Sequence, residues 1–529
     1  MSNITQNGGI IYIQQSGSDI QYQSNSTSGA WTNITSFPVT IVNSNPVQGN
    51  ILTISIITNI TIILATGYFI CGSSYITFDG TGKIITIANV SNYLGLIQNG
   101  TNLANGYSNV TVQNINSAIS GSSTLATSGG WICQSYFGKG VNNILIDNCS
   151  NSGTVNRNFS GGIGGEYVAN NGTIIISNCS NSGLISIGRG GICGRLLAVN
   201  GNSTILNCLN TGNITANFAG GITGSSIGSN NGNVSITDCI NSGVVSGTSA
   251  GGITGVQTGQ NVGTVSITNC TNSGIISGIS AGGICGAFTG QGNGKVSISN
   301  CANNGSVSGQ FAGGITGLEA GNTNGSVSIT NCNNSGIISG NFSGGISGNK
   351  FGSNSNNLCS ITNCYNTGEI NGNNSGGITG ALVGYNDNLL YTPNILIKNC
   401  YSFGNIASTA GGICGGADGT SSYTNTPIVN ITNCYTVYDS IADSDSQYIA
   451  TSLPIKSSII LTNVYSSLTN AWSDTNASSS LSGALNIYRN SRLYKYYSNF
   501  GEVWYSNQNN TPFFFTSELN TVPRRQIRD

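Results

Sequence analysis

Residues 265–286 read VSITNCTNSGIISGISAGGICG, and close variants of this phrase recur from about residue 129 to about residue 434. One marker of the period is an Asn-Cys pair, with Asp-Cys once, whose cysteines are Cys149, Cys179, Cys208, Cys239, Cys270, Cys301, Cys332, Cys364, Cys400 and Cys434. A second marker is a Gly-Gly-Ile motif, whose isoleucines are Ile163, Ile192, Ile222, Ile253, Ile284, Ile315, Ile346, Ile378 and Ile413. A fixed period near 31 residues indicates one supersecondary unit stacked on itself.

Each repeat holds three short apolar stretches, which in this copy are residues 265–267, 275–277 and 284–285. The first alternates apolar and polar residues, as a strand with one buried face does. Glycine and asparagine separate the stretches and suit tight corners, because both tolerate positive φ. No repeat contains the ten or more residues of helical periodicity that a helix needs. The phrase therefore predicts an all-β fold, a parallel β-helix with three strands in each rung.

Stacked rungs predict ladders of identical side chains along the axis. The asparagine before each cysteine is expected to hydrogen-bond to its neighbours in adjacent rungs; its members are Asn148, Asn178, Asn207, Asn269, Asn300, Asn331, Asn363, Asn399 and Asn433, with Asp238 in one rung. The glycine pair is expected where a Cβ would clash. Isoleucine and valine are expected to fill the interior.

The Gly-Gly-Ile-Thr-Gly motif, with Asn-Cys and Asn-x-Gly before it, resembles the GLUG-type repeat of surface and adhesin-like proteins. Residues 75–87, YITFDGTGKIITI, also resemble the opening rungs of pectin-lyase-like β-helices. The resemblance to the GLUG-type repeat implies a right-handed parallel β-helix. The family signature has Leu-Val-Gly where this chain has Ile-Thr-Gly or Ile-Cys-Gly.

The periodicity divides the chain into three parts. Residues 1–128 predict an irregular, β-rich N-terminal cap with the first rungs, and residues 129–434 predict the regular β-helix. Residues 435–529 contain less glycine and more aromatic residues, which predicts a C-terminal cap or oligomerisation segment. Its aromatic residues include Trp472, Tyr488, Tyr494, Tyr496, Tyr497, Trp504, Tyr505 and Phe513–Phe515. The tail 524–528 carries three cations and is interpreted as solvated.

Composition narrows the choice of partners. Charged residues make up only 6% of the chain and the formal net charge is −1, so nucleic-acid binding has no basic surface to support it. Hydrophobic residues make up 38% and follow a strand period, which argues against disorder. The surface is expected to consist of Ser, Thr, Asn and Gly, which suits glycan contact or close packing in an assembly.

The sixteen cysteines leave two interpretations open. Adjacent rungs lie close enough for disulfides between them. Alternatively, the cysteines form buried ladders of free thiols, which behave as small hydrophobic side chains. The second interpretation is favoured because Thr or Ser replaces Cys in some Gly-Gly-Ile motifs, as at Thr223 and Ser347. Zinc binding is not expected, because the chain has no CxxC motif and no histidine.

Catalysis is not expected either, and neither is a cofactor. The absence of histidine removes the commonest general base. The acids within 141–434 occupy different repeat positions and are not expected to pair as glycosidase carboxylates do; they are Asp147, Glu166, Asp238, Glu319, Glu369, Asp387 and Asp418. Arg189 and Arg195 flank one rung and could contact a sugar or an acid. Among many glycosylation sequons, the loop sites Asn158, Asn304 and Asn341 are the best candidates.

Residues 1–5 have neither a basic start nor an apolar core, so no secretory signal is expected, and no stretch is apolar enough to span a bilayer.

The expected function is a structural component of a virion or cell surface that forms homo-oligomers or a lattice. Low charge and repeats without a signal resemble giant-virus structural proteins. The alternatives are a carbohydrate-binding adhesin, secreted or on a surface, and, third, a polysaccharide lyase or hydrolase.

Overall fold

The computed structural model describes residues 2–407, 409–416, 427–437, 458–462 and 465–466. These residues form a parallel β-solenoid of about 12 turns, with about 31 residues per turn and three sheets, and the described part contains no helix. The all-β prediction, the parallel topology and the repeat length are therefore confirmed. The chain divides into two compact units, Met1–Ser273 and Gly274–Asp529, each treated separately below.

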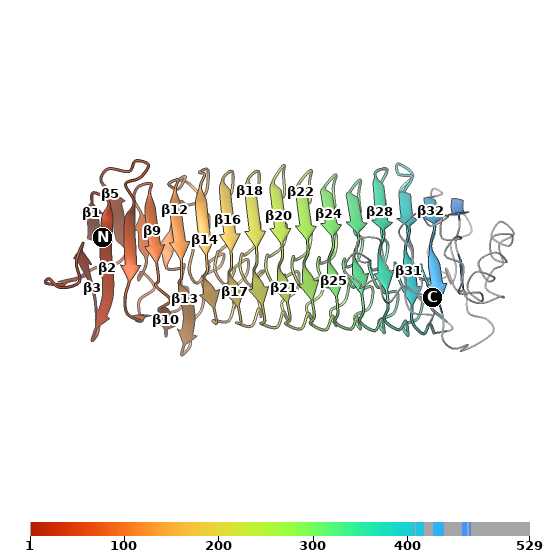
Figure 1. Cartoon of the computed structure of the whole chain (residues 1–529), viewed down its shortest axis with the longest axis horizontal. Coiled ribbons are helices and arrows are strands. Elements are labelled where there is room, and N and C mark those ends of the chain that lie inside the picture. Colours follow the sequence, from red (N-terminus) through yellow and green to blue (C-terminus); the bar gives the residue numbers. More distant parts are fainter. Residues whose placement is uncertain (1, 408, 417–426, 438–457, 463–464, 467–529) are drawn as a thin grey trace, which may run out of the picture. The chain divides into compact units, whose positions relative to one another are not determined.

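The first unit builds one sheet, the long-strand sheet, mainly from strands of three to eight residues. Its parallel strands are β2 (Gly9–Ser16), β6 (Leu52–Ile56), β9 (Ile76–Asp79), β12 (Val110–Gln113), β14 (Ile144–Asp147), β16 (Thr173–Ser177), β18 (Asn202–Leu206), β20 (Asn233–Thr237) and β22 (Thr264–Thr268). Neighbours are in register, so Ile205 of β18 pairs with Ile236 of β20 (Figure 1). Alternate residues of each strand are buried, as the sequence pattern predicts. At the N-terminal end, β3 (Asp19–Ser24) and β4 (Thr32–Asn33) add antiparallel strands.

Two further sheets complete each turn of the first unit. The short-strand sheet contains β7 (Ile60–Ile62), β10 (Ile84–Ala88), β13 (Asn116–Ser120), β15 (Ser150–Asn151), β17 (Ser180–Asn181), β19 (Leu209–Asn210), β21 (Ile240–Asn241) and β23 (Thr271–Asn272). The glycine sheet begins with β1 (Ser2–Gln6), β5 (Val39–Asn43), β8 (Phe69–Cys71) and β11 (Ile97–Gln98). Single parallel bridges between Gly-Gly-Ile motifs, such as Gly190 with Gly220, continue it.

The second unit repeats this arrangement. Its long-strand sheet contains β24 (Lys295–Ser299), β26 (Ser326–Thr330), β28 (Leu358–Thr362), β30 (Asn394–Lys398), β32 (Ile428–Thr432) and β34 (Ser458–Thr462). Its short-strand sheet contains β25 (Ala302–Asn303), β27 (Asn333–Asn334), β29 (Tyr365–Asn366), β31 (Tyr401–Phe403), β33 (Tyr435–Val437) and β35 (Tyr465–Ser466). Glycine bridges such as Gly313 with Gly344 supply the third side.

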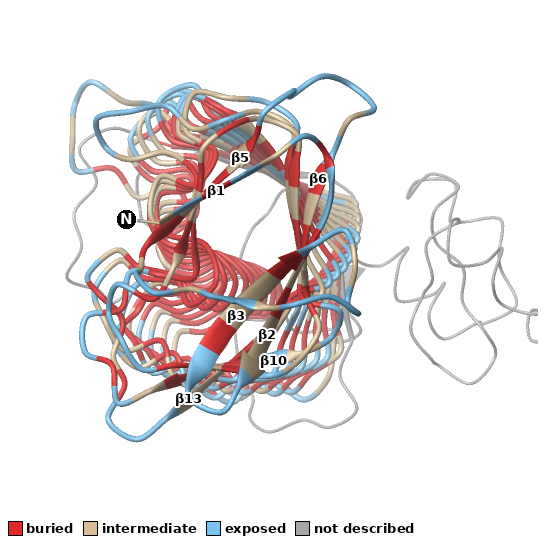
Figure 2. Ribbon diagram, turned by 90° about the vertical axis from the view of Figure 1, so that its left-hand side faces the viewer, coloured by how far each residue is buried: buried red, intermediate tan, exposed pale blue. Residues whose placement is uncertain are grey.

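In each unit, alternate residues of the long strands are buried and form the core, and Figure 2 shows much of the wall of the coil in the colour of buried residues. Ile205, Ile222 and Ile236 have no exposed surface in the first unit, and Ile298 and Ile315 have none in the second. Full burial of such a side chain contributes roughly 1.5–3 kcal/mol. The predicted aliphatic interior is confirmed.

The asparagine ladder before the cysteines is only partly as predicted. These residues turn the corner between the long and short strands in the left-handed conformation, with φ of 54° at Asn178 and 53° at Asn207. Their side chains lie near solvent, and some are linked as expected, such as Asn207 Nδ2 to Asn178 Oδ1 at 3.4 Å. Asn178 itself donates to Asp147 rather than to the preceding asparagine.

A buried asparagine ladder lies two residues after the cysteines instead. Asn210 has no exposed surface and donates to Gly212 O at 2.7 Å and to Asn241 Oδ1 at 2.7 Å. Asn181 donates in turn to Asn210 Oδ1 at 2.8 Å. Each amide thus joins two turns and donates a hydrogen bond to a corner carbonyl. These hydrogen bonds are costly to break because their surroundings have a low dielectric constant. Asn303 and Asn334 repeat this bond in the second unit.

The C-terminal prediction falls almost wholly outside the described residues. Of 435–529, only β33, β34 and β35 are described, so Trp472, the other listed aromatic residues and the tail 524–528 lie outside them, and so does Asp418. Within the described part, no helix has the length and apolar character needed to cross a membrane.

Candidate functional site

Two columns of outward side chains flank the Gly-Gly-Ile motif on successive turns. Their residues adopt the left-handed conformation although most are not glycine, with φ of 65° at Phe159 and Phe218 before the motif and 61° at Tyr136 after it. For residues other than glycine this conformation costs roughly 1–2 kcal/mol each. The fold accepts that cost in every turn and thereby holds bulky side chains at fixed places near the surface.

The chemically richest part of these columns lies in the first unit, and we call it, with three adjoining residues, the strip. Its column residues are Ser128, Tyr136, Phe159, Tyr167, Phe218, Ser226 and Gln257, and the adjoining residues, one position from a column, are Glu166, Arg189 and Arg195. Its members come from successive turns, so neighbours along the strip are separated by roughly 4.8 Å, the distance between adjacent strands.

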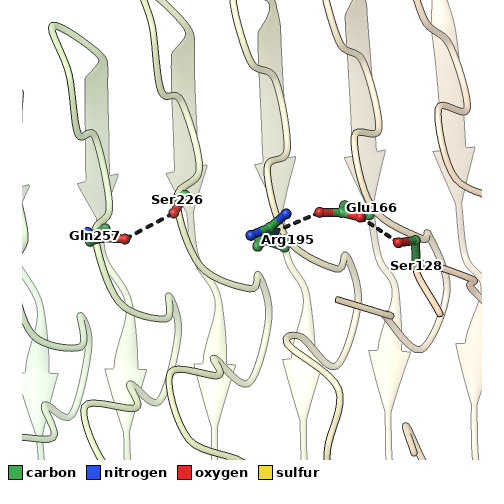
Figure 3. Close-up of polar contacts among 5 residues, drawn as sticks. All are labelled: Ser128, Glu166, Arg195, Ser226 and Gln257. Atoms are coloured by element: carbon green, nitrogen blue, oxygen red, sulfur yellow. Dashed lines mark hydrogen bonds and ion pairs between the residues drawn. The ribbon is translucent and has the colours of Figure 1, made fainter. Parts of the chain in front are cut away.

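Two groups of polar contacts lie along the strip (Figure 3). The buried carboxylate of Glu166 accepts a hydrogen bond from Ser128 Oγ on one side and from Arg195 Nε, at 2.6 Å, on the other. Farther along, Ser226 Oγ donates to Gln257 Oε1 at 3.4 Å. The side chain of Glu166 is only 5% exposed, so its carboxylate has lost most of its hydration. The ion pair with Arg195 offsets this desolvation cost, which would strongly destabilise an unpaired carboxylate.

Arginines and phenylalanines alternate beside these contacts. The Arg195 guanidinium lies 3.9 Å from the centre of the Phe159 ring. Arg189 lies between two rings, 5.6 Å from Phe159 and 5.2 Å from Phe218. Burial, together with the charge of Arg195, lowers the pKa of Arg189 from its usual range. Cation–π contacts hold the two guanidinium groups in place. Among the described residues, the one carboxylate that pairs with either of them is that of Glu166, which contacts Arg195.

The tyrosines form the other end of the strip. Tyr136 and Tyr167 stack with ring centres 4.8 Å apart and planes 7° apart. Burial, then the neighbouring Tyr167 and Glu166, raises the pKa of Tyr136, so its phenol is a neutral donor near neutral pH. Lys139 lies 5.6 Å above the Tyr136 ring.

The second unit places other residues at the same repeat positions. Phe311 and Phe342 pack with ring centres 5.5 Å apart. Glu319 and Lys350 form an ion pair at 3.5 Å, and Lys350 lies 4.2 Å above the Tyr385 ring. This arrangement also combines rings with charge, but it has one cation against one carboxylate.

The predicted acids do not gather in a catalytic arrangement within the described chain. Asp147 accepts hydrogen bonds from Ser177 and Asn178, Glu166 and Glu319 belong to separate ion pairs, and Asp238 turns a corner. Glu369 accepts a bond from Asn371, and the backbone of Asp387 donates to Asn354. No group of three Cys, Asp or Glu side chains among the described residues is placed to hold a metal ion.

All sixteen cysteines are buried free thiols. In the Asn-Cys column each sulfur donates to the carbonyl two residues earlier, as Cys179 does to Ser177 O at 3.1 Å. The free-thiol interpretation, rather than rung-to-rung disulfides, describes this structure. The three sequon asparagines singled out above, Asn158, Asn304 and Asn341, are exposed.

Sequence reasoning singled out Glu166, Arg189 and Arg195 but missed the aromatic members of the strip. A signal was present, because four phenylalanines stand two residues before the first glycine of a Gly-Gly-Ile motif; they are Phe159, Phe218, Phe311 and Phe342. The sequence pattern does not indicate that this phenylalanine position faces outward, because an aromatic residue in a β-rich repeat is more readily interpreted as part of the core.

Comparison with known proteins adds no relative. No family model, no curated protein and no solved structure matches the chain.

Proposed function

We propose that the protein is a non-catalytic structural component of a surface assembly, such as a virion fibre, spike or capsid-decorating protein, and that it acts through self-association. The observation that carries this proposal is a row of exposed aliphatic residues on the short-strand sheet. The low charge of the chain and its resemblance to GLUG-type and giant-virus proteins support it as well.

The row lies on adjacent turns of the first unit. Leu209 is 38% exposed, Ile240 is 46% exposed, and the two residues pair directly across β19 and β21. Contiguous exposed apolar residues on a rigid sheet mark an interaction surface. A second copy of the chain can cover such a row with little electrostatic cost, because the surrounding residues are mostly uncharged.

Sedimentation velocity and negative-stain electron microscopy of the full chain test the proposal. We expect ordered oligomers or fibres, which the double variant Leu209→Glu/Ile240→Glu converts to monomers. The matched control is Thr204→Glu/Ser235→Glu, which places the same charges on paired residues of the long-strand sheet. A monomeric wild-type protein at high concentration, or equal loss in both variants, argues against association through this row. Immunogold labelling of source particles then decides between a surface assembly and secreted material.

A second candidate function is carbohydrate binding by a surface adhesin. The strip favours it, because stacked rings beside charged groups are the usual elements of ligand contact. This role is compatible with an assembled shaft that presents the strip outward.

A further inference from the structure

We propose that the strip of the first unit binds a carboxylated saccharide, with Arg189 and Arg195 contacting the carboxylate and the aromatic rings contacting the sugar faces. This inference rests on the second candidate function, carbohydrate binding, and names its ligand class and its residues. It does not depend on self-association.

The first step is the unused hydrogen-bonding capacity of the arginines. Arg195 gives only its Nε to Glu166, and its side chain is 31% exposed. Arg189 donates one terminal nitrogen to Asn217 O, while its Nε is buried without an acceptor. A guanidinium offers five donors and binds carboxylates in a bidentate manner. The buried Nε of Arg189 is not accessible to a ligand, so the donors that remain for an anion are the second terminal nitrogen of Arg189 and both terminal nitrogens of Arg195.

The second step is the imbalance of charge. Two guanidinium groups lie against the rings of Phe159 and Phe218. Among the described residues, the one carboxylate paired with either group is that of Glu166, which contacts Arg195. Each arginine disfavours the charge of the other, and this repulsion contributes to the lowered pKa of Arg189. A second carboxylate at this place restores the balance, so an anionic ligand is favoured over a neutral one.

The third step is the shape of the surface. Phe218 is 39% exposed, and Tyr136 and Tyr167 are half-buried with their rings stacked. From Tyr136 to Phe218 the strip advances three turns, on the order of 14 Å. Flat rings at both ends of a cationic centre suit an extended ligand with apolar faces and a central acid. A bare inorganic anion would contact only the arginines, whereas a saccharide with a carboxylate can contact both the arginines and the aromatic rings.

The first experiment is an array of carboxylated and neutral glycans probed with the full chain, followed by calorimetry with the best carboxylated glycan and its methyl ester. We expect carboxylated glycans to be retained and the methyl ester to bind at least tenfold more weakly. Equal retention of neutral glycans overturns the inference but leaves carbohydrate binding standing. Retention of none overturns both. Displacement of the glycan by equimolar inorganic phosphate shows a simple anion site and also overturns the inference.

Variants then locate the site. Arg189→Gln and Phe218→Ala are each expected to weaken binding at least tenfold. The matched controls lie at Phe311 and Lys295 of the second unit: Phe311→Ala removes a ring from the same repeat position, and Lys295→Gln removes one positive charge. Neither control should change the affinity, and equal weakening by the controls places the site elsewhere. Each variant is first compared with wild type by thermal melting. If Arg189→Gln does not fold, Phe218→Ala decides alone, because its ring lies at the surface.

Discussion

At the scale of single residues, the cysteines show how burial of one side chain affects both its reactivity and the stability of the fold. Burial raises the pKa of Cys193 to about 12 and that of Cys359 to about 11. Cys414 rises to about 12 for the same reason. A thiol reacts as its thiolate, so these groups are held in an unreactive form near neutral pH. Their protonation also links the stability of the fold to alkaline pH.

We therefore predict that the free energy of unfolding falls as the pH rises above about 8.5, the pKa of a thiol in an unfolded chain. Above that value the unfolded state releases protons that the folded state retains, so unfolding becomes more favourable; below it these thiols have no effect. Each of the three thiols contributes a loss of about 1.4 kcal/mol per pH unit, up to its folded-state pKa. Chemical denaturation at pH 7, 8, 9 and 10 measures this slope.

The control for this prediction is the triple variant Cys193→Thr, Cys359→Val and Cys414→Thr. Other repeats carry these residues at the same positions, as Thr223 and Val327 show. The variant should lose the part of the slope that these three thiols contribute, about 4 kcal/mol per pH unit between pH 9 and 10. It should keep its stability at pH 7 to within the usual cost of a core substitution. Parallel curves for the two proteins contradict the prediction.

Residue-scale prediction from the sequence succeeded for burial and failed for hydrogen bonding. The strand alternation that places Ile236 inside is a local pattern, and it was sufficient to predict the core. The asparagines before and after the cysteine both recur with the same period, so periodicity cannot say which one points inward. Asn241 does so because it follows the corner at Asp238, whose left-handed φ of 54° reverses the inside and outside of the chain.

At the scale of the structural element, the glycine pair and the buried asparagine ladder form one packed corner. A Cβ on Gly221 would lie 2.2 Å from Gly252 O and within 3.0 Å of the side chains of Asn210 and Asn241. Gly191 makes the same approach to Gly221 O, at 2.2 Å. The sequence predicted that glycine is needed here. The structure adds the reason, which is contact with the next turn rather than a left-handed backbone.

Gly221→Ala is accordingly expected to destabilise the protein by about 3 kcal/mol, because neither the stacked backbone nor the ladder can shift without disturbing the next turn. The comparison variant is Gly17→Ala, where φ is 63° and no atom lies within 4 Å of the added Cβ. That change should cost only about 1 kcal/mol, the strain of a left-handed alanine. Urea unfolding measures both, and similar losses would show that close approach is not what the motif protects.

The strip is also an element-scale feature, and it shows why the candidate site was only partly predictable. Repetition identifies positions that are equivalent, but function depends on where the copies differ. Arg189 and Arg195 attracted notice because charge is scarce in this chain. Their contacts with Phe159 and Phe218 depend on the conformation on each side of the Gly-Gly-Ile motif, and no local sequence pattern specifies that geometry.

At the scale of the whole molecule, the protein behaves as a stack whose turns have equivalent neighbours. Within the first unit, Asn202 pairs with Thr173 on one side and with Asn233 on the other, in the same register. Stability in such a fold is approximately a sum over turns and the interfaces between them. One turn should therefore be removable if the register of all three sheets is kept.

Deletion of residues 202–232 removes one turn of about 31 residues and tests this directly. It joins Gly201 to Asn233, whose backbone nitrogen already lies 2.8 Å from Gly201 O in the intact protein. We expect a soluble β-rich protein with cooperative melting, because Cys239, Ile253 and the other ladder residues take the places of their counterparts. Deletion of residues 202–216 removes half a turn, puts strands opposite corners and should cause aggregation. If circular dichroism and thermal melting show equal loss of structure in both, the turns are not interchangeable and the fold depends on long-range contacts specific to each copy.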